Sequence, residues 1–571
     1  MLRELAELTV LDEADPQSFR VRAYESAAHG IDAFAGDIEA LGPKELQKIE
    51  GIGKSTAEKI RELIDTGRVQ KLEALRQKHP ASVVALLQIQ GLGPKAIRRL
   101  RDELGVQSID DLRAALREHR LRELKGFGIA SEDKLTRTLD RLQAQGATSR
   151  TPISVALPLA ERITALLSEV PGVSHAAYCG SLRRFCELVG DIDIVVAAAD
   201  PEAVMQTVAT LAVVERTLAR GGRKISVVTR RGIQIDVRVV ESQQLGAAQL
   251  YFTGSKAHNI KLRQRALARG LTLNEYALAE SEGGKVIASE SEEAIYAALG
   301  LAFIPPWLRE DAGEIEAAES GALPRTLGKV LGDFHLHTSL SGDARTPLAQ
   351  MVQGARARGY RALAVTDHAE GTLSGVGRDA LIEQRAQIRA LAAELGPDFA
   401  LLHGVELNIG PQGELDYDFE FRRGFDFCLA SVHDHFDLDR AAQTRRVVRA
   451  MEDPSVRMIG HLSARMIGAR PGIELDLDAI FAAAERTGTA LEINGSLPRL
   501  DLSVEALRRV RGRAVDLVLT SDAHRHEELE RITHALRNAE RAGIEPAQVV
   551  NAGSVDRLLQ WLRTPKPATA A

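Results

Sequence analysis

Cysteine is scarce in this sequence, and long apolar runs are missing. The 571 residues include three cysteines, none of them in a Cys-x-x-Cys pair. This usage excludes a disulfide framework and fits a reducing compartment. No apolar segment approaches the length that spans a bilayer, and the N-terminus, MLRELAELTVLDEAD, is acidic and amphipathic, unlike a signal peptide. We therefore expect a soluble cytoplasmic protein with no membrane partner.

An excess of positive charge is also missing. The formal net charge is −6, which argues against indiscriminate coating of nucleic acid. Any contact with nucleic acid should be local and strongest at basic patches, which occur in the N-terminal third. The length is sufficient for three or more domains with separate cores.

The most informative stretch is 180–195, which reads GSLRRFCELVGDIDIV. Asp191 and Asp193 are two residues apart in a β-branched run. A strand would place both carboxylates on one face and point Ile192 and Ile194 into a core. Such a pair suits two Mg²⁺ ions, which stabilise the attacking and leaving oxygens of a phosphoryl displacement.

A third carboxylate comes from a predicted hairpin over 224–240, KISVVTRRGIQIDVRVV. The alternation of the second strand puts its apolar side chains on one face and Asp236 on the other, where it can meet the aspartate pair. A lone Asp-x-Asp usually lies at a solvated strand end. The complete set, in which Gly-Ser precedes Gly-Asp-x-Asp and a hairpin aspartate, is far more specific.

Gly180 and Ser181 end a short predicted strand, and their N–H groups suit a triphosphate, with Arg183 or Arg184 close behind. This set of residues resembles the nucleotidyltransferase palm of the polymerase β superfamily. That superfamily includes tRNA-tailing, poly(A)-adding and antibiotic-modifying enzymes, so the palm alone does not decide whether a DNA template is copied.

The next segment, LYFTGSKAHNIKLRQRALARGLTLNEY, resembles the nucleotide-binding region of family X DNA polymerases. The resemblance implies that Tyr251, Phe252 and Gly254 line the deoxyribose. Asn259 would contact the base edge and Arg263 the template minor groove. The alternative is a β-turn before a basic amphipathic helix. The full nucleotide-binding set implied by the resemblance is Gly180, Ser181, Arg184, Gly190, Tyr251, Phe252, Gly254, Asn259 and Arg263.

One residue departs from the family pattern. Members usually carry glycine after the paired arginines, whereas Phe185 and then Cys186 follow here. A bulky side chain lacks the backbone freedom of glycine. We expect a reshaped triphosphate loop, and if the ring crowds the phosphates, Phe185→Gly should lower the nucleotide KM.

Residues 1 to about 145 are predicted to be helical, with three similar turns: IEGIGKSTAEKI, IQGLGPKAIRRL and LKGFGIASEDKL. The glycines permit a tight turn, and the N–H groups of the following helix can hold an anion. One such turn would indicate only a glycine-capped connection. Three copies resemble helix-hairpin-helix elements, which hold DNA phosphates without reading sequence. The implied DNA-binding glycines are Gly51, Gly53, Gly91, Gly93, Gly126 and Gly128.

Lys59 lies six residues after Gly53 on the first of these helices. Most lysines are solvated, and the motif also serves DNA binding alone. In relatives of polymerase β, however, a lysine at this place in Gly-x-Gly-x-x-x-Ala-Glu-Lys is the Schiff-base nucleophile that removes a 5′-deoxyribose phosphate. The resemblance therefore implies a catalytic role for Lys59.

The acidic, Ala/Gly-rich segment 309–330 is predicted to be a linker, and ten of the fifteen histidines follow Lys329. Seven short apolar runs then alternate with helical stretches, which predicts a parallel sheet. The runs are VLGDFHLH, ALAVTDH, ALLHGVELNI, FCLASVHD, RMIGHL, TALEING and DLVLTSDAH. Six runs end in His, Asp or Glu, where barrel enzymes keep their active sites, so we expect a seven-stranded distorted barrel.

So many imidazoles and carboxylates at one end of a barrel would be unfavourable unless cations bound them. The string resembles the PHP (polymerase and histidinol phosphatase) domain, which holds up to three Zn²⁺, Mn²⁺ or Fe ions. The resemblance implies one ion at His335, His337, Glu406 and Asp522, and a second at Glu406, His433 and His461. A third would lie at Asp343, His368 and His524, while His403, His435 and His526 have no place in the pattern.

The match covers nearly the whole chain and resembles a bacterial-type family X DNA polymerase with a C-terminal PHP nuclease. It implies gap filling on primed DNA with dNTPs, by two Mg²⁺ or Mn²⁺ ions at Asp191, Asp193 and Asp236, and PHP trimming of 3′ ends, abasic lesions or 3′-phosphates. We expect a nucleoid-associated monomer active in base-excision repair. The alternative is a DNA-binding phosphoesterase whose palm is catalytically weak.

The predicted fold class is multidomain α/β and α+β. An all-α helix-hairpin-helix region would precede a polymerase β-like palm and thumb and a distorted (βα)₇ barrel. The expected segments are 1–78 (lyase-like helix-hairpin-helix), 79–148 (fingers-type helix-hairpin-helix), 149–242 (palm), 243–310 (nucleotide-selecting thumb), 311–330 (linker) and 331–571 (PHP).

Overall fold

The computed structural model describes most of the chain. The described residues are 1–15, 18–33, 38, 41–49, 51–89, 92–124, 127–128, 131–133, 135–136, 150–372 and 374–566. They form two compact units, Met1–Ser149 and Arg150–Ala571. Within these ranges, no helix combines the length and the apolar character of a membrane span. Gly91 and Gly126 lie outside the described residues.

The first unit is helical, as predicted. Its helices are α1 (Leu2–Glu13), α2 (Phe19–Ala33), α3 (Pro43–Leu46), α4 (Lys54–Thr66), α5 (Gln70–Lys78), α6 (Ala81–Val84), η1 (Ala85–Gln88), α7 (Pro94–Leu104), α8 (Ile109–Arg117) and η2 (Arg120–Glu123). They bury two apolar cores, one among α1, α2, α4 and α5 and one around α7 and α8.

The three glycine turns share one backbone hydrogen bond between residues three apart. The donors Ile52, Leu92 and Phe127 reach the carbonyls of Ile49, Ile89 and Leu124 at 3.1, 3.0 and 3.0 Å. Gly53 and Gly93 then precede α4 and α7 as N-cap residues. The turns therefore present the first N–H groups of these two helices in the same way.

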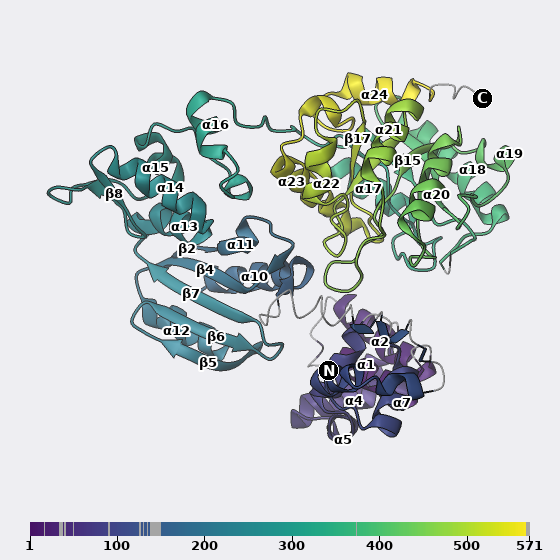
Figure 1. The fold of residues 1–571 in the computed structure, drawn as a ribbon, viewed down its shortest axis with the longest axis horizontal. Coiled ribbons are helices and arrows are strands. Elements are labelled where there is room, and N and C mark those ends of the chain that lie inside the picture. Colours follow the sequence, from purple (N-terminus) through teal and green to yellow (C-terminus); the bar gives the residue numbers. More distant parts are fainter. Residues whose placement is uncertain are drawn as a thin grey trace. The chain divides into compact units, whose positions relative to one another are not determined.

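The palm begins the second unit. Its elements are β1 (Thr151–Pro152), α10 (Ile153–Ser168), β2 (Val173–Tyr178), α11 (Gly180–Arg183), β3 (Leu188–Val189), β4 (Asp191–Ala198), α12 (Pro201–Thr210), β5 (Val214–Arg220), β6 (Lys224–Thr229), β7 (Gln234–Val240) and η3 (Ser242–Gln244). Five strands form a sheet in the order β2-β4-β7-β6-β5 (Figure 1), and the predicted hairpin is β6 and β7.

Alternation along β4 sorts its side chains between two layers. Ile192 and Ile194 are buried with residues of α10 and α12 on one face. Val195 lies on the other face, in a small cluster with residues of α13 (Leu245–Thr253). Asp191 and Asp193 share the face of Val195, because side chains two residues apart point the same way.

The thumb follows with α13, α14 (Lys256–Leu267), β8 (Leu271–Leu273), β9 (Leu278–Glu280), β10 (Val286–Ala288), α15 (Glu292–Ala298), η4 (Pro306–Leu308) and α16 (Glu314–Ser320). Helix α16 lies inside the segment predicted as a linker. Its Ile315 and Ala318 are buried in the thumb core, and its first-turn Glu314 accepts a hydrogen bond from the backbone N–H of Asp311 at 2.9 Å. The apolar side chains of α16 therefore anchor this part of the acidic segment to the thumb.

All seven predicted strands of the C-terminal barrel are present, parallel and in sequence order. They are β11 (Gly332–Asp333), β12 (Ala362–Val365), β13 (Ala400–Asn408), β14 (Phe427–Ser431), β15 (Val456–Ile459), β16 (Ala490–Asn494) and β17 (Leu517–Thr520). The helices are α17 (Leu348–Ala357), α18 (Arg378–Leu395), α19 (Phe419–Arg422), α20 (Arg440–Glu452), α21 (Leu477–Thr487), α22 (Val504–Val510), η5 (His526–Arg531), α23 (Ile532–Ala542), η6 (Pro546–Gln548) and α24 (Val555–Arg563). Helices α17 to α24 surround the strands (Figure 1).

The first and last strands of the barrel meet only beyond their ends. Asp522 donates its N–H to the carbonyl of His335 at 3.0 Å, and His337 donates to the carbonyl of Ala523 at 2.8 Å. This near-closure brings the histidines after β11 next to the residues after β17. The predicted distorted barrel is confirmed.

The palm and the barrel pack against each other within the second unit. Leu500, from the loop after β16, is fully buried in the palm core. Arg465 forms a bidentate pair with Glu187 of the palm, with N–O distances of 3.0 and 2.8 Å. The barrel is therefore an integral part of this unit.

Candidate active sites

The three palm aspartates come together as predicted. β4 and β7 are parallel, and their register pairs Asp193 directly with Asp236. Together with Asp191 they offer three carboxylate oxygens within 4.8 Å of one another. Gly180 has a φ of +63°, and a Cβ at this position would clash with Oδ2 of Asp193. The glycine thus allows the loop to pass close to the carboxylate.

Repulsion and burial perturb this triad. Burial raises the pKa of Asp193 to about 7, and the charges of Asp191 and Asp236 act in the same direction. The pKa of Asp191 is also raised, by burial and then by Asp236. Clustered carboxylates that resist ionisation are typical of a site completed by cations.

The two arginines of the loop after β2 have different partners. Arg183 makes a bidentate ion pair with the buried Glu292, at 2.9 and 2.7 Å. Arg184 donates through Nε to Glu310 at 3.0 Å and through Nη1 to the carbonyl of Thr253 at 2.6 Å. Its Nη2 has no hydrogen-bond partner among the described residues, so Arg184 keeps a donor for a ligand.

Four of the other nucleotide-binding predictions lie on the thumb helices α13 and α14: Tyr251, Phe252, Asn259 and Arg263. Tyr251, Asn259 and Arg263 line one small pocket. Asn259 donates to the carbonyl of Tyr251 at 2.7 Å, which fixes the amide. The ring of Phe252 lies 4.5 Å from the guanidinium of Arg238, the residue that follows Val237 on β7.

The remaining residues of that set are glycines and a serine. Gly254 has a φ of +69°, and a Cβ there would lie 3.3 Å from Nη1 of Arg184. Ser181 lies in the short helix α11, immediately after Gly180. Gly190 directly precedes β4 and would give a Cβ open space, so no steric demand for glycine exists there.

Phe185 does not lie where the sequence suggested. It has a φ of +60° and is fully buried, so the backbone takes the left-handed conformation that glycine usually supplies. Its ring centroid is 5.8 Å from that of His534 and 5.2 Å from the guanidinium of Arg537, both on α23. The condition attached to Phe185→Gly, that the ring crowds the phosphates, is not met, because the ring packs against the barrel.

In the first unit, Lys59 is half-buried on α4. Its Nζ donates to Oγ of Ser55 at 2.7 Å and lies 5.8 Å from the ring of Tyr24. Gly51 has a φ of +83°, and a Cβ there would overlap the backbone of Ser26. Glycine is therefore required where this turn contacts α2. Gly128 accepts the N–H of Glu132 at 3.1 Å at the third turn.

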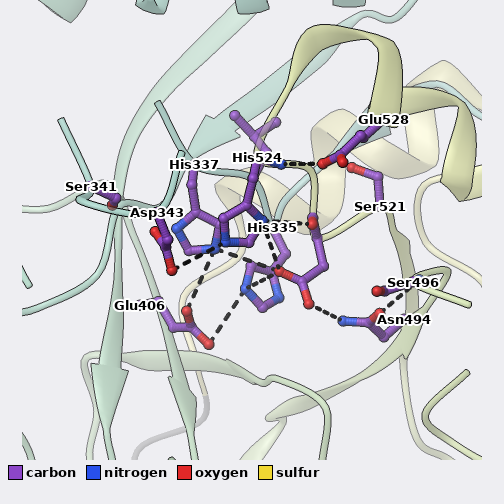
Figure 2. A network of polar contacts seen from close by, with 12 residues as sticks. His335, His337, Ser341, Asp343, Glu406, Asn494, Ser496, Ser521, His524 and Glu528 are labelled. Carbon is purple, nitrogen blue, oxygen red and sulfur yellow. Dashed lines mark hydrogen bonds and ion pairs between the residues drawn. The ribbon is translucent and has the colours of Figure 1, made fainter. Parts of the chain in front are cut away.

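The nine predicted barrel ligands converge at the carboxyl ends of the strands. Figure 2 shows five of them, His335, His337, Asp343, Glu406 and His524. Glu406 lies at the centre. His368, His433 and His461 place a ring nitrogen 2.8, 3.2 and 3.0 Å from its oxygens. His335 and His337 lie 3.4 and 3.6 Å from it and 3.6 Å each from Asp522.

Asp343 completes the cluster on one side. Its Oδ2 lies 3.3 Å from His368 and 3.6 Å from His524. Figure 2 shows the rings of His337 and His524 lying side by side near Asp343, and their centroids are 4.3 Å apart. The residues line a pocket of about 450 Å³.

The chemistry of this donor set fits metal ions. Four groups of three ligands have donor atoms within 4.8 Å of one another: His337, His368 and His524; His335, His337 and Asp522; His335, Glu406 and His461; His368, Glu406 and His433. In the described residues, both ring nitrogens of His337 and of His433 are buried without a hydrogen-bond partner. Buried nitrogens without partners are costly unless a cation accepts their lone pairs.

Charges within the barrel site are strongly coupled. Burial alone would lower the pKa of His335, but Glu492, Glu406 and Asp522 raise it well above its usual value. Burial lowers the pKa of His337 well below its usual value, and His368 and His524 add to this. A lowered pKa favours the neutral imidazole, which is the form that can bind a metal ion.

Sequence reasoning missed several residues that support this site. Glu492, in the middle of β16, is fully buried and accepts hydrogen bonds from Nδ1 of His335 and from Thr520, both at 2.5 Å. It orients His335 as second carboxylates orient metal-binding histidines. The position of Glu492 between Leu491 and Ile493 in an apolar strand was the sequence feature that could have indicated its role.

Arg499 is the second residue that the sequence did not reveal. Its Nε lies 3.3 Å from Oδ2 of Asp522, and it lines the same pocket. Nη1 is buried without a hydrogen-bond partner in the described part of the chain. An arginine at the edge of an anionic cluster suits a phosphate.

The three histidines outside the pattern lie apart from the cluster's donor groups. His403 is buried against Phe425, and burial with nearby arginines lowers its pKa to about 3. His435 is half-exposed and pairs with Asp434 at 2.9 Å. His526 pairs with Glu527 at 3.2 Å.

Comparison with known proteins agrees with this architecture. Family models match a helix-hairpin-helix domain at 1–69, a SAM-like helix-hairpin-helix tandem at 83–141, a DNA polymerase beta thumb at 248–310 and a PHP domain at 333–496. The fold and its two sites thus define a polymerase β-type nucleotidyltransferase joined to a PHP barrel.

The chain is 34% identical over 549 residues to the DNA polymerase/3′-5′ exonuclease PolX of Bacillus subtilis (strain 168), covering 95% of each protein. It therefore belongs to the bacterial PolX-type family X DNA polymerases. A probable phosphatase of Syntrophotalea carbinolica is 29% identical over 231 residues, 38% of this chain and 90% of that protein. One from Vibrio cholerae serotype O1 is 26% identical over 232 residues, 39% and 89% respectively.

Proposed function

We propose that this protein is a DNA-directed DNA polymerase that fills short gaps during DNA repair and degrades 3′ ends with its barrel. The observation that carries the proposal is the presence of two complete, separate ligand sets in one chain. The palm offers Asp191, Asp193 and Asp236, and the barrel offers a cluster around Glu406. Similarity to the Bacillus subtilis PolX over 95% of the chain supports the same pairing of activities.

In the palm, the three aspartates would hold two Mg²⁺ or Mn²⁺ ions with the triphosphate of an incoming dNTP. Ions bound there supply positive charge to the attacking and leaving oxygens. Arg184, through Nη2, would donate to a phosphate. Tyr251, Phe252 and Gly254 would contact the sugar, Asn259 the base edge and Arg263 the template strand.

In the barrel, up to three Zn²⁺, Mn²⁺ or Fe ions would lie among the nine ligands. Such ions supply positive charge to phosphate oxygens and acidify water. Glu406 has ligands on both sides and would bridge two positions. Glu492 orients the ring of His335 through the hydrogen bond at Nδ1, and Arg499 would bind the scissile phosphate.

The barrel also suits removal of a 3′-phosphate or incision at an abasic site. Two probable phosphatases share similarity with part of this chain, which supports phosphoester hydrolysis in general. The pocket is lined by residues from several loops, among them Arg499, which would face a phosphate ester. These substrates would differ only in the group esterified to the phosphate.

DNA would be held by the glycine turns of the first unit. The helix starts after Gly53 and Gly93 present N–H groups to phosphates without reading bases. Lys59 would act as the Schiff-base nucleophile on a 5′-deoxyribose phosphate. Its side chain is partly exposed and its amine is held beside Ser55, where a sugar aldehyde can reach it.

The test uses the purified full chain with a primer annealed to a gapped template and with Mg²⁺ or Mn²⁺. We expect stepwise dNMP addition, and Mn²⁺-dependent release of 3′ nucleotides when dNTPs are omitted. A chain that releases nucleotides but never extends the primer would favour the alternative, a DNA-binding phosphoesterase with a weak palm. Borohydride trapping on a 5′-deoxyribose phosphate, with Lys59→Ala as control, tests the lyase step.

A further inference from the structure

Palm, thumb and barrel meet at one arginine. Arg541, in the last turn of α23, donates through Nη1 to the backbone carbonyl of Phe185 at 3.0 Å. Its Nη2 lies 3.5 Å from Sγ of Cys186 and 3.6 Å from Oε1 of Glu310. The side chain is 14% exposed, so these contacts are made largely away from water.

Glu310 links this arginine to the triphosphate loop. The same oxygen, Oε1, accepts from Nε of Arg184 at 3.0 Å and from Sγ of Cys186 at 3.4 Å. One carboxylate therefore lies between two guanidinium groups, one from the palm and one from the barrel. Because Nη1 of Arg184 donates to the carbonyl of Thr253, Nη2 is the nitrogen that remains for a ligand within the described residues.

The neighbouring Phe185 fixes the same junction. Its ring is fully buried beside His534, and the guanidinium of Arg537 lies 5.2 Å from Phe185 and 5.6 Å from Trp307. The loop that begins at Gly180 thus packs, at Phe185, against side chains of α23. The residue that departs from the family pattern is the one that joins the palm to the barrel.

We infer that Arg541 of the barrel is a positioning residue for nucleotide binding in the palm. It fixes Glu310 and the backbone after Arg184, so that Nη2 of Arg184 is held ready for a phosphate of the incoming dNTP. The inference rests on the proposed polymerase activity and adds a barrel residue to it.

The physical reason is a balance of charge. With Arg541 present, the single negative charge of Glu310 is shared by two cations. Without Arg541, the negative charge of Glu310 acts on Arg184 alone and weakens the attraction of Arg184 for a phosphate. The backbone carbonyl of Phe185 also loses its hydrogen-bond donor. The loss affects binding of the phosphates and leaves the carboxylate triad unchanged.

The test compares Arg541→Ala with wild type in the full chain, with Arg509→Ala as a matched control. Arg509 is an exposed barrel arginine paired with Asp478 at 2.9 Å. For Arg541→Ala we expect the dNTP KM and the inhibition constant of pyrophosphate to rise together, about tenfold, the effect of one charged hydrogen bond. The kcat, the Kd for gapped DNA and the nuclease rate should stay within about twofold, less than half a kcal/mol.

A conservative variant separates positioning from packing. Arg541→Lys keeps the charge beside Glu310 and should recover part of the KM, while Arg541→Met fills the space without charge and should not. Glu310→Gln should raise the KM, and its combination with Arg541→Ala should be less than additive because both act through Arg184.

Each outcome has one meaning. If wild type extends primers and folded Arg541→Ala has the same dNTP KM, the inference is wrong and the proposed polymerase stands. The inference is also wrong if Arg541→Met matches wild type, or if nuclease and KM change together with a fall in Tm. If wild type itself never extends a primer, the proposed function fails first.

Discussion

The two candidate metal-binding sites of this chain differ in the kind of ligand and in burial. The palm triad consists of carboxylates alone, each partly exposed on the inner strands β4 and β7, and burial with mutual repulsion raises the pKa of Asp193 to about 7. The barrel cluster mixes histidines with carboxylates, and Glu406, His335 and His337 have no exposed surface. In the barrel the histidines lower the pKa of Glu406 well below its usual value, although burial opposes them.

This difference indicates two kinds of metal binding. A partly exposed site made of carboxylates alone would need the phosphates of the substrate to complete it, and this suits Mg²⁺ that arrives and leaves with each nucleotide. A buried site with unpartnered nitrogens suits ions that stay and help to hold the barrel together. Polymerisation should therefore depend on free metal during turnover, and nuclease activity on metal acquired beforehand.

The largest expected effect is the loss of primer extension in Asp193→Ala. Asp193 is paired directly with Asp236 across the parallel strands β4 and β7. Removal of a group that stabilises the transition state electrostatically costs about 10³-fold in rate. Nuclease activity should stay at the wild-type level, because the barrel cluster has its own ligands. The exposed Glu215 on the edge strand β5 supplies the control Glu215→Ala, which should extend primers normally. Extension that persists in Asp193→Ala would show that the palm is assigned wrongly.

The reverse effect tests whether the sites are separate. His337→Ala removes a ligand shared by two groups of the barrel cluster. We expect a decrease of about a hundredfold or more in Mn²⁺-dependent 3′ nucleotide release, with extension largely intact. His526→Ala, which removes a histidine outside the ligand set, is the matched control. A thermal melt checks folding, and loss of both activities in folded His337→Ala would mean that one centre serves both.

Chelation should distinguish resident from exchangeable metal. After EDTA treatment and buffer exchange, we expect Mg²⁺ alone to restore extension at once, whereas nuclease activity should return only after Mn²⁺ or Zn²⁺ is added back. Removal of resident ions should lower the Tm by about 5 °C or more. If nuclease activity returns as quickly as extension with Mg²⁺ alone, the two sites do not differ in this way.

Local patterns predicted the features that lie along one strand. The alternation around Asp191 and Asp193, and the His, Asp or Glu after six apolar runs, are decided by backbone periodicity. They are therefore visible without a structure. The near-closure of the barrel followed from the strand and helix alternation, although the hydrogen bonds between Asp522 and His335 were not predicted individually.

Contacts between distant segments were not predictable in this way. Glu492 lies 157 residues from its partner His335, and Arg541 lies 356 residues from Phe185. No periodicity relates such positions. From the sequence, Glu492 was therefore not distinguished from other strand residues, and Phe185 was interpreted as a disturbance of the triphosphate loop. This interpretation of Phe185 came from judging a side chain by its neighbours in sequence, when its packing partner is on α23.

The smallest expected effect follows from the burial and mutual repulsion of the palm aspartates. Asp193 has a folded-state pKa of about 7, raised from 3.8 by burial and then by Asp191 and Asp236. A raised carboxyl pKa favours the folded state below the unfolded value of 3.8, and this advantage is lost as the pH rises through 7. Asp193→Asn removes the titration, so with chelator present the variant should gain stability over wild type between pH 5 and pH 8.

We expect its Tm to exceed that of wild type by about 2–4 °C at pH 8, the shift for roughly 1 kcal/mol in a domain of this size, and by little at pH 5. Saturating Mg²⁺ should reduce the difference, because the cations offset the repulsion in wild type and Asn binds them poorly. Asp343→Asn offers the contrast within the same chain. His368 and His524 outweigh burial there and lower the carboxyl pKa, so this substitution should lower the Tm. Equal Tm curves for Asp193→Asn and wild type from pH 5 to pH 8 would show that the palm carries no such repulsion, and the contrast between the two sites would lose its electrostatic basis.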